Sequence, residues 1–331
     1  NSSSIIKELA DITHGFVAAD LSALISRACT KAAKENRDCL LDSDLFWALT
    51  QVKPSAMREV LVQVPNIRWN DIGGQEELKL KLRQSVEWPL HYPDAFSRLG
   101  ISPPRGVLMF GPPGCSKTMI AKALATESKL NFLSIKGSEL FSKWVGESER
   151  AVRELFKRAR SVAPSIIFFD ELDAIGGERR SGGSSGSNVE ERVLSQLLTE
   201  LDGVEPLENV IIVAATNRPD RIDKALIRPG RLDCLLYVPL PDLHSRQQIL
   251  QLQFRKTPIG EDVQVDELAT NLEGYSGAEI VAVCHEAAVA ALQENLNASV
   301  VRKIHFLTAI QIITPRTPSA LLNLYKNYMK S

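Results

Sequence analysis

The spacing of hydrophobic residues changes twice along the chain. Apolar residues first recur at helical spacing, which predicts helices over residues 21–34, capped by Asp20, and over 42–53. Between residues 106 and 239, short continuous apolar runs alternate with helical segments. These runs predict strands over residues 106–110, 131–135, 165–170, 209–215 and 235–238. Helical spacing returns after residue 242.

The same pattern predicts how two helices are arranged. The helix over residues 21–34 gathers its apolar residues on one face, namely Leu21, Leu24, Ile25 and Ala28. Residues 75–87 are expected to form an amphipathic helix. Prolines at positions 89, 93, 103 and 104 are expected to keep the stretch after it irregular.

The alternation of apolar runs with helices predicts an α/β fold. Short runs that are apolar throughout are typical of a parallel sheet covered by helices on both faces, here with five strands. Such sheets bind ligands at the carboxyl ends of their strands. The polar residues that follow the predicted strands are therefore the first candidates for a functional site.

A small helical unit occurs twice in the chain. Residues 8–10 and 15–21 resemble residues 267–269 and 274–280, and the offset is 259 in both cases. Residues 48–50 pair with residues 309–311 at an offset of 261. The collinear matches predict a repeated unit, and chance similarity of two amphipathic segments is the alternative.

Composition narrows the classes of protein. The chain has 331 residues, a formal net charge of −1 and 44% hydrophobic residues, which is typical of globular proteins. No apolar run approaches the roughly 18 residues that span a bilayer, and the near-neutral charge disfavours a dedicated duplex-DNA binder. The five cysteines show no CxxC spacing and the five histidines no HExxH pattern. This favours reduced thiols in the cytoplasm, with a nuclear or mitochondrial pool as the alternative.

The strongest candidate for chemistry is the loop after the first predicted strand of the alternating region. It reads Gly111-Pro112-Pro113-Gly114-Cys115-Ser116-Lys117-Thr118 and precedes a helical segment. Backbone N–H groups of such a loop surround a nucleotide's phosphates, Lys117 reaches the β- and γ-phosphates, and the Thr118 hydroxyl binds Mg²⁺. Ser116 stands where the usual pattern GxxxxGK[ST] has glycine. Because Cys115 precedes a helix N-terminus, we expect its pKa to be lowered.

Two acids end another predicted strand. Asp170 and Glu171 follow the apolar run over residues 165–169. Beside a phosphate-binding loop, Asp170 can hold hydrated Mg²⁺ and Glu171 can polarise the water that attacks the γ-phosphate. A strand that merely ends in a solvated turn is the alternative.

Three further polar residues are candidates with weaker signals. Asn217 follows the next strand and could contact the γ-phosphate or the attacking water, although Asn before Arg-Pro is also common in turns. Arg228 and Arg231 flank a Pro-Gly turn and suit phosphate contacts at a neighbouring subunit's nucleotide, as arginine fingers in trans. A surface salt-bridge pair is the alternative for these arginines.

The order of the segments GPPGCSKT, FFDE, ATNRPD, RPGR and GYSGAE resembles the AAA+ ATPases, and the resemblance covers the whole chain. It points to the tandem, two-ring subgroup typified by valosin-containing protein. The pair Cys115-Ser116 is similar, more narrowly, to the diazaborine-resistance and spermatogenesis-associated ATPases of ribosome maturation. The resemblance implies a longer protein with two ATPase units. It also implies the lid of the first unit over residues 1–60, a linker over 61–70, an ATPase domain over 71–240 and a second lid over 241–331.

The resemblance also implies roles that the pattern alone does not single out. The expected adenine pocket comprises Asp71, Ile72, Gly73, Gly277 and Ala278. Trp144 and Val145 resemble the pore loop of a hexamer, which grips polypeptide, and residues 178–188 resemble a second pore loop. Residues 201–203 resemble an intersubunit signalling segment.

These features predict a motor that hydrolyses ATP with Mg²⁺, forms a homo-hexamer and pulls a polypeptide substrate through a central pore. The task implied by the resemblance is the release of maturation factors from pre-60S ribosomal particles, with no direct nucleic-acid readout and no membrane contact. The alternatives are a segregase of ubiquitin-linked proteins, a non-hydrolysing nucleotide-bound scaffold and a nucleic-acid motor. Glu171 disfavours the scaffold, and the aromatic Trp144 favours a polypeptide substrate over a nucleic acid.

Overall fold

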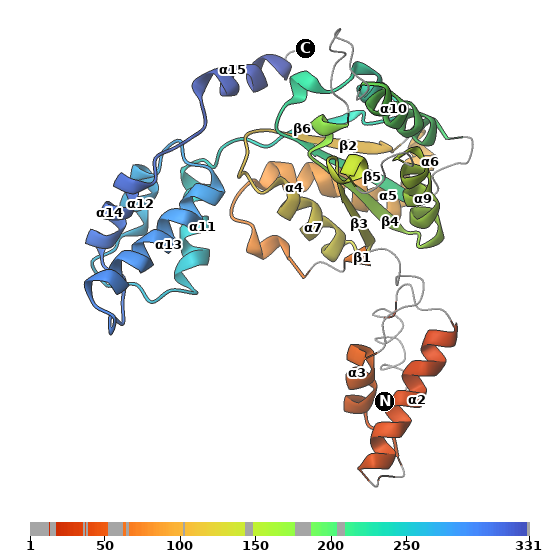
Figure 1. Cartoon of the computed structure of the whole chain (residues 1–331), viewed down its shortest axis with the longest axis horizontal. Coiled ribbons are helices and arrows are strands. Elements are labelled where there is room, and N and C mark those ends of the chain that lie inside the picture. The colour runs from red at the N-terminus through yellow and green to blue at the C-terminus, as the bar shows by residue number, and fades with distance from the viewer. Residues whose placement is uncertain are drawn as a thin grey trace.

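The computed structural model describes residue 13 and residues 18–35, 37, 39–51, 62–63, 66–101, 103–142, 148–175, 187–203 and 209–329. Figure 1 shows three parts, which are a pair of N-terminal helices, a central sheet unit and a helical lid. Within the described residues, no helix is both long and apolar enough to cross a bilayer.

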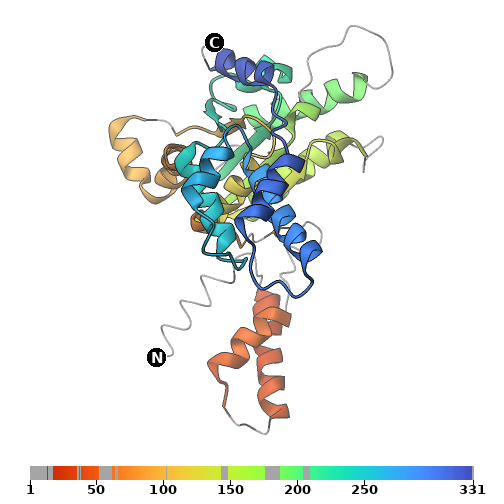
Figure 2. The ribbon, with the colours of Figure 1, turned by 90° about the vertical axis from the view of Figure 1, so that its left-hand side faces the viewer.

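The N-terminal part consists of helices α2 (Ala18–Lys34) and α3 (Asp42–Gln51), which stand away from the sheet unit in both ribbon views (Figures 1 and 2). Helix α2 starts before Asp20, so the prediction of Asp20 as its cap is wrong. Leu24 and Ala28 pack against α3, whereas Leu21 and Ile25 are 40% and 52% exposed. Among the described residues α2 packs on α3, and this contact buries half of the predicted apolar face.

The connecting segment contains more helix than the pattern predicted. It includes a two-residue strand β1 (Val62–Gln63), a 3₁₀ turn at Trp69–Asp71, α4 (Glu76–Leu82), a π-helical turn at Arg83–Glu87, α5 (Trp88–His91) and α6 (Pro93–Leu99). The predicted irregular stretch is therefore wrong over residues 88–99. Pro93 lies in the first turn of α6, where a missing N–H leaves no helical hydrogen bond unmade. Pro89 lies in α5, which follows directly on the π-helical turn.

Over the described residues the central sheet has six strands, in the order β1-β3-β4-β5-β2-β6. The five main strands are β2 (Gly106–Phe110), β3 (Asn131–Lys136), β4 (Ser165–Asp170), β5 (Val210–Thr216) and β6 (Cys234–Tyr237). They pair in parallel, and within the described part of the chain β1 runs antiparallel, on β3. The predicted parallel five-stranded sheet is thus confirmed, with β5 lying between β2 and β4.

Helices cover both faces of this sheet, which explains why its central strands β2, β4 and β5 are mostly apolar. Helices α4 and α7 (Lys117–Glu127) cover one face, which includes Met109 and Phe168. Helices α9 (Ser148–Ser161) and α10 (Ser187–Asp202) cover the other face, which includes Leu108 and Phe169. A short helix, α8 (Glu139–Ser142), precedes α9. Since neighbouring strand residues point to opposite faces, both sets must be apolar.

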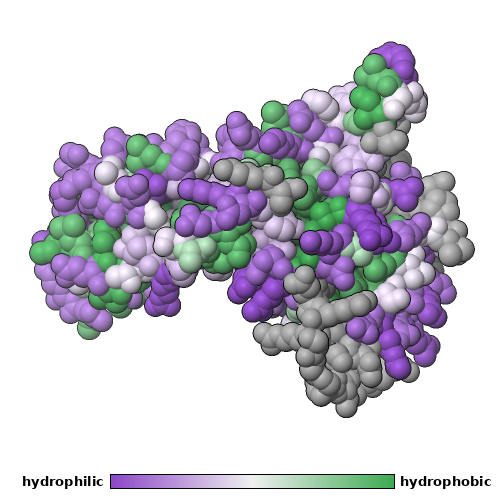
Figure 3. Space-filling model, turned by 90° about the horizontal axis from the view of Figure 1, so that it is seen from above, coloured by the Kyte–Doolittle hydropathy of each residue, from purple (hydrophilic) through white to green (hydrophobic). Residues whose placement is uncertain are grey.

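The lid consists of α11 (Leu243–Phe254), α12 (Val265–Asn271), α13 (Gly277–Glu294) and α14 (Lys303–Ile312) around its own core. A last helix, α15 (Ser319–Tyr328), leaves the lid and returns to the sheet unit (Figure 1). Seen from above, the lid forms one end of the molecule, and hydrophilic side chains cover most of the visible surface (Figure 3).

Helices α3 and α14, which correspond in the two copies of the helical unit, start in the same way but with different side chains. In α3 the side chain of Asp44 accepts a hydrogen bond from the backbone N–H three residues earlier, and in α14 the ring of His305 does the same. Asp44 pairs with Lys31 and Arg37, whereas His305 bonds to Glu294. Hydrogen bonding from Arg37 holds the pKa of Asp44 well below its usual range.

Candidate functional site

The candidate residues meet at the carboxyl edge of the sheet. The loop over residues 111–116 follows β2, Asp170 ends β4 and Asn217 follows β5. Since β5 lies between β2 and β4, Asn217 stands between the loop and the acids. Parallel strands therefore bring these three sequence-predicted segments together.

The loop requires unusual backbone angles at several positions. A Cβ atom on Gly111 would lie 2.1 Å from the carbonyl oxygen of Val238, so no side chain fits there. Gly114 has a φ of +75°. Ser116 has a φ of +62° and lies in the left-handed region, which costs a non-glycine residue roughly 1–2 kcal/mol. The usual glycine at this position is thus explained by backbone geometry, and Ser116 is strained.

Lys117 is buried at the start of α7 and points back into the loop. Its Nζ atom donates to the carbonyl oxygens of Gly111 and Pro112, at 2.9 and 2.7 Å. Burial lowers its pKa to about 8. An anionic phosphate oxygen is a stronger acceptor for this ammonium than a neutral carbonyl, so the amine is placed to bind a phosphate group.

Thr118 and Asp170 form the candidate metal site. The Thr118 hydroxyl donates to Asp170 Oδ2 at 2.8 Å. A hydroxyl and a carboxylate are oxygen donors of the kind Mg²⁺ prefers, and nucleotide phosphates commonly complete its coordination. Among the described residues, no group of three or more His, Cys, Asp or Glu side chains is arranged to hold a metal by itself. The pair thus fits a metal that arrives with a nucleotide.

Glu171 directly follows β4 and has an unusual backbone. Its φ is +54°, its side chain is exposed and its backbone N–H donates to Asp170 Oδ1 at 3.1 Å. A Cβ on Gly137 would lie 2.5 Å from the Glu171 carbonyl oxygen. Left-handed non-glycine residues cluster at functional sites. The strain thus agrees with a functional role for this carboxylate.

Sequence reasoning missed a hydrogen-bond network behind Asn217. The Thr216 hydroxyl donates to Asp173 Oδ1 at 2.8 Å and accepts from the backbone N–H of Arg218 at 2.9 Å. The hydroxyl of Tyr325, on α15, donates to the carbonyl oxygen of Asn217 at 2.7 Å. Asp173 lies two residues after Glu171 and could have been suspected from that position, but nothing in the pattern pointed to Tyr325.

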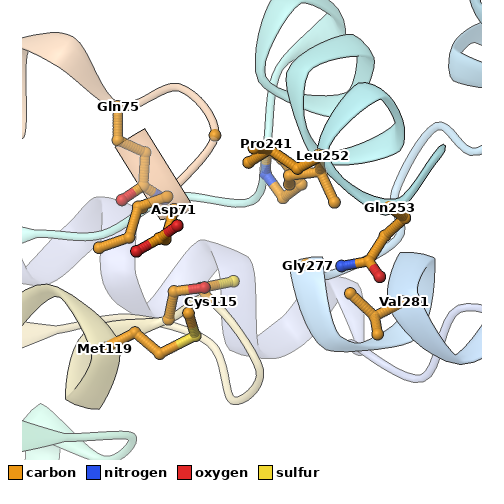
Figure 4. Close-up of a pocket in the computed structure, with 13 residues that line it drawn as sticks. Asp71, Gln75, Cys115, Met119, Pro241, Leu252, Gln253, Gly277 and Val281 are labelled. Atoms are coloured by element: carbon orange, nitrogen blue, oxygen red, sulfur yellow. The ribbon is translucent and has the colours of Figure 1, made fainter. Parts of the chain in front are cut away.

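A pocket opens between the loop and the lid (Figure 4). It has about 560 Å³ of empty space, including its open mouth, and residues from the connecting segment, the loop, α7, α11 and α13 line it. Apolar side chains prevail, among them Ile72, Met119, Ile249, Leu252 and Val281. Gln75 also lines it, with a buried Oε1 atom that has no hydrogen-bond partner among the described residues. A nucleotide's base, which is flat and apolar on its faces and polar along its edges, fits this mostly apolar pocket.

The residues expected to form an adenine pocket fall on this surface in part. Asp71, Ile72, Gly73 and Gly277 line it. Ala278 instead joins the lid to the loop, because its N–H donates to the carbonyl oxygen of Gly114 at 3.0 Å. The carboxylate of Asp71 accepts the backbone N–H of Arg68 at 2.8 Å.

Cys115 lines the same pocket, but the expectation of a lowered pKa is wrong. The thiol is 2% exposed, and burial raises its pKa to about 11. Lys117 acts in the opposite direction but is outweighed. The position before a helix therefore matters less than desolvation, which disfavours the thiolate.

The two candidate arginines differ. Arg231 makes two hydrogen bonds of 2.6 Å to the carboxylate of Asp202 and also donates to the carbonyl of Ala225. Arg228 is exposed, and the described residues offer its guanidinium no hydrogen-bond partner. The guanidinium of Arg228 is thus exposed near the Asp202 carboxylate, whose pKa it helps to lower, whereas Arg231 bonds directly to Asp202. The predicted pore-loop residues Trp144 and Val145, and residues 178–186, lie outside the described part of the chain.

Two family models match the chain. The model of the ATPase family associated with various cellular activities (AAA) matches residues 107–240. The model of the AAA+ lid domain matches residues 4–46 and again residues 262–308. The second match confirms that the helical unit is repeated.

Curated relatives align with nearly the whole chain. The human ATPase family gene 2 protein homolog A is 55% identical over 98% of this chain and 38% of its own length. The ATPase family gene 2 protein of Schizosaccharomyces pombe is 49% identical over 98% of this chain and 41% of its own. The cell division cycle protein 48 homolog of Archaeoglobus fulgidus is 51% identical over 90% and 43%. The chain thus spans about two fifths of the length of these relatives.

Proposed function

The chain belongs to the AAA family of ATPases, and on this premise we propose that it hydrolyses ATP with Mg²⁺ between the sheet edge and the lid. The observation that carries the proposal is the 2.8 Å contact between the Thr118 hydroxyl and Asp170, with Lys117 adjacent in the loop and Glu171 adjacent in the strand. A hydroxyl, a carboxylate, a buried ammonium and a second carboxylate are the groups that phosphoryl transfer to water needs.

Each residue has a role in this reaction. Lys117 binds the β- and γ-phosphates, and the apolar pocket takes the base. Thr118 and Asp170 would hold Mg²⁺, which neutralises charge on the phosphates. Glu171 accepts a proton from the attacking water, and Asn217 orients that water or the γ-phosphate.

Hydrolysis measured against Mg²⁺ concentration tests the proposal. In Asp170→Asn we expect turnover at saturating Mg²⁺ to fall by roughly a hundredfold or more, because the metal loses its carboxylate. The matched control is Asp266→Asn, an exposed carboxamide substitution in the lid, which should leave turnover unchanged. Turnover without a divalent cation, or at the normal rate in Asp170→Asn, would contradict the assignment.

The motor function is proposed for the longer protein. We infer a homo-hexamer in which Arg228 reaches a neighbour's nucleotide, because its guanidinium is exposed and has no hydrogen-bond partner within the described chain. Hydrolysis would then drive a polypeptide through the central pore in the cytoplasm. Arg228→Ala should abolish the gain in turnover on assembly and leave the melting temperature unchanged.

The proposed task is release of maturation factors from pre-60S ribosomal particles. Its support is the resemblance of Cys115-Ser116 to the ribosome-maturation subgroup. A segregase for ubiquitin-linked proteins shares the same site, and similarity to the cell division cycle protein 48 homolog keeps it as the second candidate. A full-length Glu171→Gln protein, which holds ATP and substrate, would be isolated and its bound proteins identified. Pre-60S components support the first task, and ubiquitin conjugates the second.

A further inference from the structure

Helix α15 brings a buried tyrosine to the candidate site. Tyr325 is fully buried, and its ring lies 5.8 Å from the ring of Tyr237 and 6.5 Å from the ring of Phe110. Phe110 is the last residue of β2, directly before the phosphate loop. The ring of Tyr328 packs on Phe110 as well, at 5.2 Å. The aromatic contacts therefore anchor α15 on the strands that carry the site.

The hydroxyl of Tyr325 holds one end of a particular peptide group. It donates to the carbonyl oxygen of Asn217 at 2.7 Å. The N–H of the same peptide group belongs to Arg218 and donates to the Thr216 hydroxyl at 2.9 Å. That hydroxyl in turn donates to Asp173 at 2.8 Å. Both polar groups of this peptide are thus fixed, which restrains rotation of the peptide plane beside Asn217.

We propose that Tyr325 is a positioning residue for Asn217. The inference rests on the proposed function, in which the Asn217 side chain contacts the γ-phosphate or the attacking water. Without the hydroxyl, the carbonyl of Asn217 loses its partner and the peptide plane can rotate, so the side chain is aimed correctly for only part of the time. Nucleotide affinity is set mainly by Lys117 and the pocket, so the effect falls on turnover.

The same helix is tied to the lid. The Tyr275 hydroxyl donates to the carbonyl oxygen of Ile313 at 2.7 Å, and the backbone N–H of Arg316 donates to Glu279 at 2.9 Å. These bonds fix the segment that joins the lid to α15. Helix α15 thus contacts Asn217 through Tyr325, and the segment before this helix is held by the lid. The position of Asn217 therefore depends on how α15 docks on the sheet unit.

Tyr325→Phe tests the inference in the full chain, because it removes the hydroxyl and keeps the ring. We expect single-turnover hydrolysis of ATP to slow by roughly tenfold, with the Kd for ATP within about twofold of its normal value and an almost unchanged melting temperature. The control is Thr270→Val, which also loses a hydroxyl-to-carbonyl bond, but one that lies within the lid helix α12 and takes no part in docking α15. It should leave the single-turnover rate unchanged.

A double mutant separates positioning from folding. If Tyr325 acts through Asn217, then Tyr325→Phe should slow hydrolysis no further in an Asn217→Ala background. A normal rate in Tyr325→Phe overturns the inference. So does a slower rate that persists in full when Asn217 is already alanine, or that comes with a large loss of melting temperature. If Asn217→Ala itself hydrolyses ATP normally, the proposed role of Asn217 fails instead.

Discussion

The two sides of the candidate site are built differently. The phosphate side consists of charged and hydroxyl side chains at the ends of neighbouring strands, with Lys117, Thr118 and Asp170 in direct contact with loop carbonyls or with each other. The base side is the pocket of Figure 4, lined mostly by apolar side chains from separate segments. Under the proposed function, the difference assigns the reaction to the phosphate side, whereas the base side selects the nucleotide and adds a smaller share of its affinity.

Removing the ammonium group of Lys117 should have the largest effect on binding, and it should act on the phosphate side alone. In Lys117→Ala we expect affinity for ATP to fall by about a hundredfold, since charge-assisted hydrogen bonds to the phosphates are lost. Affinity for adenosine, which occupies the base side alone, should not change. Calorimetry with both ligands measures this. Unchanged ATP affinity would refute the phosphate-loop role, and an equal loss for adenosine would show that the substitution damaged the pocket.

Changing pH titrates the same group without a mutation. Burial places the pKa of Lys117 at about 8, and a phosphate binds the protonated amine. Affinity for ATP should therefore fall by about tenfold between pH 7 and pH 9. The stability of the nucleotide-free chain should change in the opposite direction and rise with pH. Between pH 8 and the usual lysine pKa of 10.5, the unfolded chain binds more protons at this lysine than the folded chain does. Lys117→Arg, which stays charged, should bind ATP independently of pH over this range, and a wild-type affinity that is flat between pH 7 and pH 9 would contradict the account.

A truncation on the base side should act more weakly. Val281→Ala removes two methyl groups from the pocket wall on α13, so ATP and ADP should each bind about fivefold more weakly. Inorganic tripolyphosphate, which reaches only the phosphate side, should bind as before. Weaker binding of tripolyphosphate would show that the two sides are not independent.

The smallest effect concerns Ser116, between the two sides. Its left-handed backbone costs roughly 1–2 kcal/mol, while glycine loses roughly 0.5–1 kcal/mol more entropy on folding. Ser116→Gly should thus stabilise the chain by roughly 0.5–1 kcal/mol, measured by urea unfolding. Ser116→Ala keeps the strained backbone and should give no such gain. A destabilised Ser116→Gly would mean that the hydroxyl contributes more than the strain costs.

The phosphate side could be predicted from the sequence because its residues follow apolar runs within short segments. Parallel pairing then had to bring Asp170 and Asn217 to the loop. The base side could not be derived in this way. Backbone atoms and apolar side chains line it, and nothing in their sequence distinguishes a pocket wall from the core of a helix or strand. Only the resemblance indicated Asp71 and Gly277, and it did not indicate Gln75 or Val281.

The sequence-based predictions were wrong or incomplete where contacts between distant parts of the chain decide a residue's environment. Cys115 precedes a helix, yet burial raises its pKa to about 11, so its alkylation should lag behind that of the exposed Cys29 and Cys39. Tyr325 lies 108 positions from Asn217, and no motif joins them. Arg228 and Arg231 look equivalent in sequence, and only the structure shows that Arg231 is paired with Asp202.

The most direct test of the account measures binding and turnover together in Glu171→Gln. Glutamine keeps the size of the side chain but cannot accept a proton from water. We expect ATP to bind within about threefold of normal and hydrolysis to slow by about a thousandfold. Glu273→Gln, an exposed substitution in the lid, should change neither quantity. Hydrolysis at the normal rate in Glu171→Gln would contradict the central claim that the phosphate side of this site carries out the reaction.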